Sequence, residues 1–146
     1  MAEHLFRCAI DDAGLADRVA VGSRSLRVDA GAPMDPRAVR TLGLGAAEVA
    51  HRSAPVDAAD LADTDLFVCM TREHREQLAA AGPAALLLTR FDPSATDGAD
   101  GADVPDPISG DLDAYRRTRA IIEAAVPGLL AHVSRALTSA AAPEHG

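Results

Sequence analysis

The sequence contains no lysine, asparagine or tryptophan, and all fourteen basic residues are arginine. This bias, together with abundant alanine, is typical of a GC-rich bacterial genome. Acidic residues outnumber basic ones by 22 to 14, the formal charge is −8, and aromatic residues make up 3% of the chain. No basic stripe interleaved with aromatic residues is present, so the composition argues against nucleic acid as a partner.

Cysteine and long apolar runs are scarce as well. Only Cys8 and Cys69 are present, and the sequence shows neither a secretory signal nor an uninterrupted apolar run of about eighteen residues. We therefore expect a cytoplasmic protein that has no disulfide and does not insert into a membrane.

The first helix lacks a cap. Apolar residues recur at helical spacing from Ala2 to Ala13, and Gly14 ends the run, but Met1-Ala2-Glu3 contains no Ser, Thr, Asp or Asn. The leading N–H groups of a helix need partners. We therefore expect a further segment in front of this helix.

Helix and strand patterns alternate along the rest of the chain, which favours an α/β fold with a parallel sheet. The 146 residues fit one domain, predicted over 1–138, followed by a disordered tail over 139–146. The stretch 93–110 has no periodicity and is predicted to be a long surface loop. The predicted elements are strands at Val19–Ser25, Leu66–Met70 and Leu86–Leu88, and helices that begin near Asp35-Pro36, Asp57, Thr71 and Leu112, the last kinked at Pro127.

Several segments match one family in the family's own order. Met1–Arg7 resembles the stretch that directly follows the phosphate loop of low-molecular-weight protein tyrosine phosphatases, where the pattern reads C-x-G-N-x-C-R-S-P-M-A-E. Five further matches are Val21–Ser25 with V-D-S-A-G, Gly31–Val39 with G-x-P-x-D-P-R-A, Ala50–Arg52 with S-H-R, Asp65–Met70 with D-L-I-L-x-M, and Arg90–Pro93 then Asp103–Pro107 with F-D-P then D-V-P-D-P. Six matches in order identify the chain as a member of this family.

The resemblance implies a three-layer α/β/α domain with a short parallel sheet in the order 2-1-3-4, whose first, interior strand is missing here. It also implies a protein tyrosine phosphatase that needs no cofactor and acts on a phosphotyrosine protein or a small phosphomonoester. The family's nucleophilic Cys and its phosphate-binding Arg lie in the loop that this chain lacks. Translation is therefore expected to begin upstream of Met1, and residues 1–146 are expected to be loosely packed and inactive.

Three residues match functional positions of the family. Asp106 matches the general acid, while Ser23 and His51 match residues that support the phosphate loop. From the residues alone, Asp106 could be an ordinary Asp-Pro turn, and Ser23 and His51 could be a polar strand end and a turn histidine. Without the loop, Ser23 and His51 are expected to face solvent or to be unpaired.

A Cys-x5-Arg pattern, the spacing that the family uses in its phosphate loop, runs from Cys69 to Arg75. It contains no glycine, and Glu73 would repel a phosphate. We therefore interpret Cys69 as a core thiol, Cys8 as structural, and the chain as having no nucleophile of its own.

Other readings have less support. Asp97, Asp100 and Asp103 suggest a calcium loop, but Ile108 stands where an EF-hand needs its closing Glu, so we expect no metal. An arsenate reductase on the same scaffold would need further redox cysteines. A non-catalytic interaction domain that has lost its loop remains the main alternative.

Overall fold

The computed structural model describes residues 1–27, 30–45, 50–82, 84–95 and 100–141. Its elements are α1 (Ala2–Asp12), α2 (Pro36–Leu42), α3 (Ala58–Asp63), β1 (Phe67–Cys69), α4 (Arg72–Ala80), β2 (Ala85–Leu87), the 3-10 helix η2 (Leu88–Phe91) and α5 (Leu112–Ala141). The helices expected near Asp35-Pro36, Asp57, Thr71 and Leu112 are all present.

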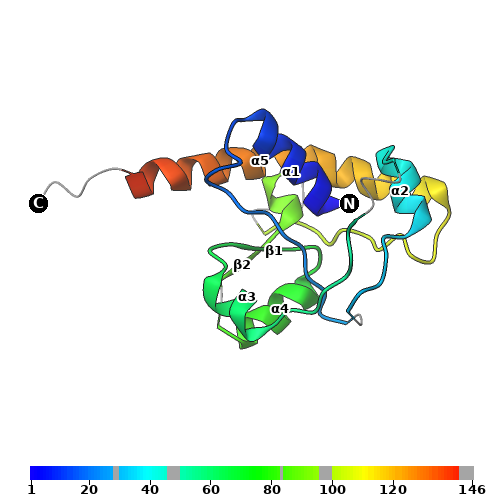
Figure 1. The fold of residues 1–146 in the computed structure, drawn as a ribbon, viewed down its shortest axis with the longest axis horizontal. Helices are drawn as coiled ribbons and strands as arrows, with labels where there is room; N and C mark the ends of the chain where they lie inside the picture. Colours follow the sequence, from blue (N-terminus) through cyan, green and yellow to red (C-terminus); the bar gives the residue numbers. More distant parts are fainter. Residues whose placement is uncertain (28–29, 46–49, 83, 96–99, 142–146) are drawn as a thin grey trace, which may run out of the picture.

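The described strands form a two-stranded parallel sheet between two layers of helices. β1 and β2 pair in register, with Phe67 opposite Ala85 and Cys69 opposite Leu87. In Figure 1, α3 and α4 lie below the strands, whereas α1 and α5 lie above them. This arrangement confirms the three-layer α/β/α prediction.

Alternation along β1 divides the apolar residues between the two layers, because successive side chains of a strand point to opposite faces. Phe67 and Cys69 belong to the cluster with Leu78 of α4. Leu66, Val68 and Met70 pack against the other cluster, whose buried residues are Leu88, Val104, Ile122, Ala125 and Leu129. Both faces of the sheet are therefore covered.

Local capping explains where the short helices begin. The side chain of Asp35 accepts a hydrogen bond from the N–H of Arg37 at 2.8 Å, and Pro36 occupies the first helical position of α2. Asp57 and Asp60 form a reciprocal capping box at α3. Thr71 caps α4 by accepting from the N–H of His74 at 3.2 Å.

The strand predicted over Val19–Ser25 is wrong for the described structure. That segment forms only an isolated bridge between Ser25 and Pro55. A strand requires a neighbour for its backbone groups, and in the part of the chain that is described no strand lies beside residues 19–24. The predicted strand at 86–88 is shifted by one residue, because Leu88 already begins η2.

Helix α5 is the longest element and continues through Pro127 to Ala141. It therefore extends three residues beyond the predicted domain boundary at 138, and residues 142–146 lie outside the described residues. By length and composition alone, its stretch Leu112–Ala140 could cross a membrane. In this structure α5 packs against α1, α2 and η2 and contributes Ile122, Ala125 and Leu129 to the core.

Candidate active site

The first turn of α1 carries a polar cluster centred on Glu3. The hydroxyl of Ser23 donates a hydrogen bond to Glu3 Oε2, and Nδ1 of His51 lies 3.4 Å from the same oxygen. Arg7 Nη2 donates to Glu3 Oε1 at 2.6 Å and to the carbonyl oxygen of Val21, also at 2.6 Å. The structure thus brings Ser23 and His51 together through a carboxylate.

This cluster corrects the expectation that Ser23 and His51 would be unpaired. Their partner is Glu3, which lies within the Met1–Arg7 match and to which the resemblance assigns no role. The Glu3 side chain is 18% exposed. An acidic residue in the first turn of a helix is favoured by the partial positive charge of the helix N-terminus, and Glu3 also forms an i,i+4 ion pair with Arg7.

Asp106 lies on the segment that leads into α5, and its carboxylate is held within its own loop. Its Oδ1 accepts a hydrogen bond from the N–H of Ile108 at 3.0 Å, and the residue is exposed. Two residues earlier, Val104 is 4% exposed and belongs to the core cluster against which Met1 and Ala2 pack. Asp106 therefore follows a chain segment anchored in the same cluster as the start of α1.

The Cys-x5-Arg pattern at residues 69–75 does not form a phosphate-binding loop. Cys69 is 4% exposed, and burial raises the pKa of its thiol, which opposes formation of a thiolate. The N–H of His74 donates to Thr71, and that of Arg72 donates to Asp103 Oδ1 at 2.9 Å, so these two amides already have partners. The interpretation of Cys69 as a core thiol is confirmed.

Two of the three aspartates that suggested a calcium loop, Asp100 and Asp103, have other contacts. Asp103 bonds the backbone at α4, Asp100 Oδ1 lies 3.9 Å from Arg75 Nη1, and Asp97 lies outside the described residues. Cys8, expected to be structural, is exposed, and its Sγ lies 3.8 Å from Nε2 of His4.

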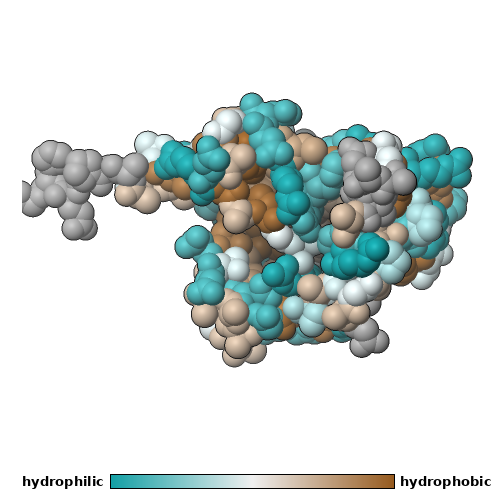
Figure 2. Space-filling model, in the orientation of Figure 1, coloured by the Kyte–Doolittle hydropathy of each residue, from teal (hydrophilic) through white to brown (hydrophobic). Residues whose placement is uncertain are grey.

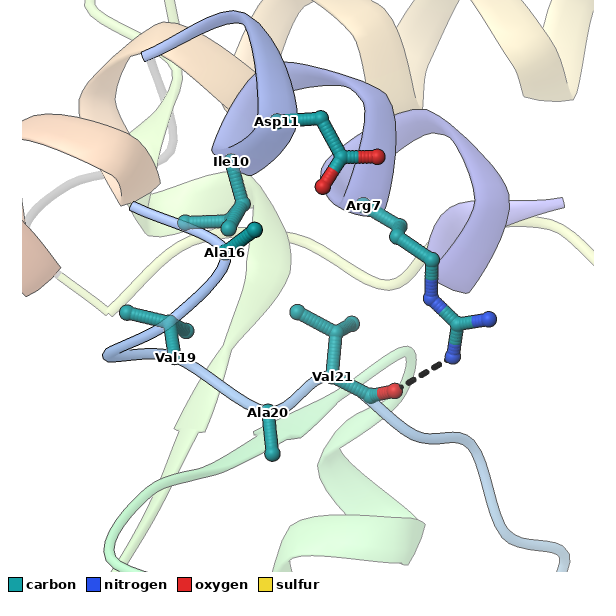
Figure 3. Close-up of a pocket in the computed structure, with 7 residues that line it drawn as sticks. All are labelled: Arg7, Ile10, Asp11, Ala16, Val19, Ala20 and Val21. Carbon is teal, nitrogen blue, oxygen red and sulfur yellow. Dashed lines mark hydrogen bonds between the residues drawn. The ribbon is translucent and has the colours of Figure 1, made fainter. Parts of the chain in front are cut away.

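A hollow of about 280 Å³ lies between α1 and the segment that follows it. Figure 3 shows Ile10, Val19 and Val21 along its apolar part and Arg7 bound to the Val21 carbonyl at one side. On the face drawn in Figure 2, apolar surface also shows between α5 and the lower layer. None of Asp106, Ser23 and His51 lines the hollow, although Arg7 links it to the Glu3 cluster.

The sequence profile of the family described as low molecular weight phosphotyrosine protein phosphatase matches residues 1–139. The chain belongs to this family. Low molecular weight protein-tyrosine phosphatase A of Mycobacterium tuberculosis is 35% identical to it, over 88% of this chain and 80% of the relative. A low molecular weight protein-tyrosine-phosphatase of Streptomyces coelicolor is 30% identical, over 97% and 90%.

Solved structures of protein tyrosine phosphatases share the fold of this chain. A protein tyrosine phosphatase of Entamoeba histolytica superposes with a TM-score of 0.80 at 20% identity, covering 92% of this chain and 88% of that one. A low molecular weight protein tyrosine phosphatase of Bacillus subtilis gives 0.74 at 25% identity, covering 92% and 87%. The family and the fold class predicted from the sequence are both confirmed.

Proposed function

We propose that this phosphatase-family chain hydrolyses phosphomonoesters through a cysteinyl-phosphate intermediate, with a nucleophile loop encoded upstream of Met1. Family membership supports the reaction class. The 146 residues contain one Cys-x5-Arg pattern, which begins at Cys69. Cys69 is buried, and burial raises the pKa of its thiol. We therefore propose that the thiolate comes from a segment outside these residues.

In the proposed reaction, the loop thiolate attacks phosphorus, and an S–P bond forms as the bond to the leaving oxygen breaks. Asp106 gives its proton to that oxygen. In the second step the Asp106 carboxylate takes a proton from water, whose oxygen attacks phosphorus and releases the thiolate and inorganic phosphate. The observation that supports this role for Asp106 is the position of its loop. The loop follows Val104, which belongs to the core cluster against which Met1 and Ala2 at the start of α1 pack.

The Glu3 cluster is proposed to support the nucleophile loop. Ser23 and His51 lie on segments distant in sequence, and Glu3 gathers both at the first turn of α1. A phosphate held by backbone N–H groups at a helix N-terminus needs that turn to be fixed. Glu3 fixes it by binding the two neighbouring segments.

The pair that follows Asp106-Pro107 is proposed to shape the substrate preference. Ile108 is 56% exposed, and Ser109 follows it. The resemblance to the family implies aromatic residues at these positions, which would stack on a phosphotyrosine ring. An aliphatic side chain supplies contact area but no ring stacking. We therefore propose a substrate whose phosphorylated group is not an extended aromatic ring.

An Ile108→Tyr substitution should improve use of phosphotyrosine. A stacked aromatic pair contributes about 0.5 to 1.5 kcal/mol beyond its area, so kcat/KM for a phosphotyrosine peptide should rise roughly 2- to 12-fold. Turnover of a small alkyl phosphate should not rise with it. Steady-state kinetics on both substrates, with Ser109→Thr as a control, would show whether the increase is specific to the ring.

Purified residues 1–146 should not hydrolyse p-nitrophenyl phosphate above background, since the proposed thiolate is absent. Protein expressed from the native reading frame with its upstream codons should do so. Cys69→Ser should leave the activity of that longer protein unchanged. Turnover by residues 1–146 that disappears in Cys69→Ser would contradict the proposal, and an upstream stop codon would favour a non-catalytic interaction domain.

A further inference from the structure

The chain that follows Asp106 is tied to a helix more than sixty residues away in sequence. The guanidinium of Arg37, at the start of α2, donates from Nη2 to the carbonyl oxygen of Ile108 at 3.0 Å and from Nη1 to that of Gly110. We propose that Arg37 is a positioning residue for Asp106: it fixes the segment after the acid so that the carboxyl group stays in place. This inference deepens the proposed function and rests on it.

The guanidinium itself is rigidly oriented. Asp35 accepts from Arg37 Nε at 3.0 Å and from Nη2 at 2.8 Å, a forked arrangement that a planar guanidinium fits. The central carbon of the guanidinium lies 4.8 Å from the ring centroid of Tyr115, which is 3% exposed in the second turn of α5. The hydrogen bonds from Arg37 hold the pKa of Asp35 well below its usual range, so the pair is ionised near neutral pH.

A short path of bonds leads from Arg37 to the acid. The carbonyl oxygen of Ile108 is held by Arg37, and the N–H of the same residue donates to Asp106 Oδ1 at 3.0 Å. The position of Ile108 therefore determines where a carboxylate oxygen of Asp106 is held. Release of the Ile108 carbonyl would let this hydrogen bond, and the carboxylate with it, change direction.

The segment before Asp106 is held by other residues. Thr118, which is 5% exposed, donates to the carbonyl oxygen of Pro105 at 3.1 Å. The N–H of Val104 donates to the Met70 carbonyl oxygen at 2.8 Å. Loss of Arg37 should consequently free the second half of the loop while the first half stays in place.

The effect on catalysis should depend on the leaving group. A displaced general acid still allows attack by the thiolate, but it protonates the leaving oxygen less often, and misplacement by about 1 Å can cost on the order of 100-fold. Arg37→Met should therefore slow phosphoenzyme formation by about 10- to 100-fold for alkyl phosphates. The loss should be small for p-nitrophenyl phosphate, whose leaving group needs little protonation.

The test uses protein expressed from the native reading frame with its upstream codons, in the parent and in Arg37→Met, Arg37→Lys and Arg40→Met. Arg40 lies on α2 as well and does not bind the carbonyl oxygens of Ile108 and Gly110 that Arg37 binds, so it is the matched control. Lysine keeps the charge but cannot fork to Asp35 and bridge two carbonyls, so Arg37→Lys should recover only part of the loss. Amide exchange measured by NMR should accelerate at Ile108 in Arg37→Met and stay unchanged in Arg40→Met.

Each outcome decides a separate point. A larger loss for poor leaving groups, with faster exchange at Ile108, supports the positioning role. If turnover needs Asp106, but Arg37→Met lowers the rate equally for all leaving groups or does not lower it at all, the positioning role is wrong. The proposed function is unaffected by that result. Exchange at Ile108 that is equal in the parent and Arg37→Met also overturns the positioning role, and a parent without turnover overturns both.

Discussion

An Asp106→Ala substitution is expected to slow phosphoenzyme formation by about 10²- to 10⁴-fold, the usual contribution of a well-placed general acid. The effect should be largest for substrates with poor leaving groups, because alanine cannot give a proton to the departing oxygen. It should shrink for leaving groups that need no proton. Rapid-quench measurement of the phosphoenzyme, in protein that includes the upstream codons, would separate this step from hydrolysis of the intermediate.

The control for this substitution has to be chosen from the structure. Asp103, three residues earlier, bonds the N–H of Arg72 and so helps to start α4, and its removal should disturb the loop. Asp100 is more suitable, because its side chain is 81% exposed and its Oδ1 lies 3.9 Å from Nη1 of Arg75, which is long for an ion pair. Asp100→Ala should change the rate by less than about twofold, as isolated surface ion pairs contribute little. Equal losses at Asp106 and Asp100 would leave Asp106-Pro107 as a turn without a catalytic role.

The helices could be predicted because their starts depend on residues close in sequence. Asp35, Asp57 and Thr71 each accept from an N–H two or three residues further on, and this pattern is visible in the sequence. The strand at Val19–Ser25 could not be predicted in the same way. Its formation depends on a neighbouring strand, and the sequence of a segment does not reveal whether that neighbour is there.

The contacts that hold residues 100–110 could not be predicted from the sequence either. The absence of periodicity correctly predicted that the described residues of the 93–110 stretch form no helix or strand. The structure nevertheless buries Val104 and holds Ala102 through the Thr89 hydroxyl, which accepts from its N–H at 2.7 Å. These hydrogen bonds join side chains to backbone groups that are distant in sequence. They could not be predicted, because the sequence does not show which backbone group a given threonine or arginine will bind.

The same limitation applies to the candidate site. Asp106, Ser23 and His51 were found by resemblance, whereas Glu3 and Arg37 acquire their proposed roles only when distant segments meet. Glu3 could have been suspected, since it was the acidic residue in the first turn of an otherwise uncapped helix. For Arg37, the sequence showed only a helix start, because its partners lie 71 and 73 residues further along the chain.

Gly128→Ala is expected to destabilise the protein by roughly 1 to 3 kcal/mol, by overpacking the contact between α5 and η2. Gly128 lies inside α5, where alanine is ordinarily more favourable than glycine by about 1 kcal/mol. Here an added Cβ would overlap the carbonyl oxygen of Phe91 and lie 3.0 Å from its carbonyl carbon. Both groups belong to the backbone of η2, which cannot move aside as a flexible side chain would. The substitution is therefore expected to lower the stability of the protein here, although it would raise it in an ordinary helix.

Urea denaturation of the protein with its upstream codons would measure this change. Gly22→Ala is the control, because an added Cβ there meets only Arg24 Nη1 at 3.5 Å, and its free energy of unfolding should change by less than about 0.5 kcal/mol. Since η2 also carries Thr89, which holds Ala102 ahead of the acid, displacement of η2 should speed amide exchange at Ala102 as well. A Gly128→Ala protein as stable as the parent would show that α5 and η2 do not pack as closely as described.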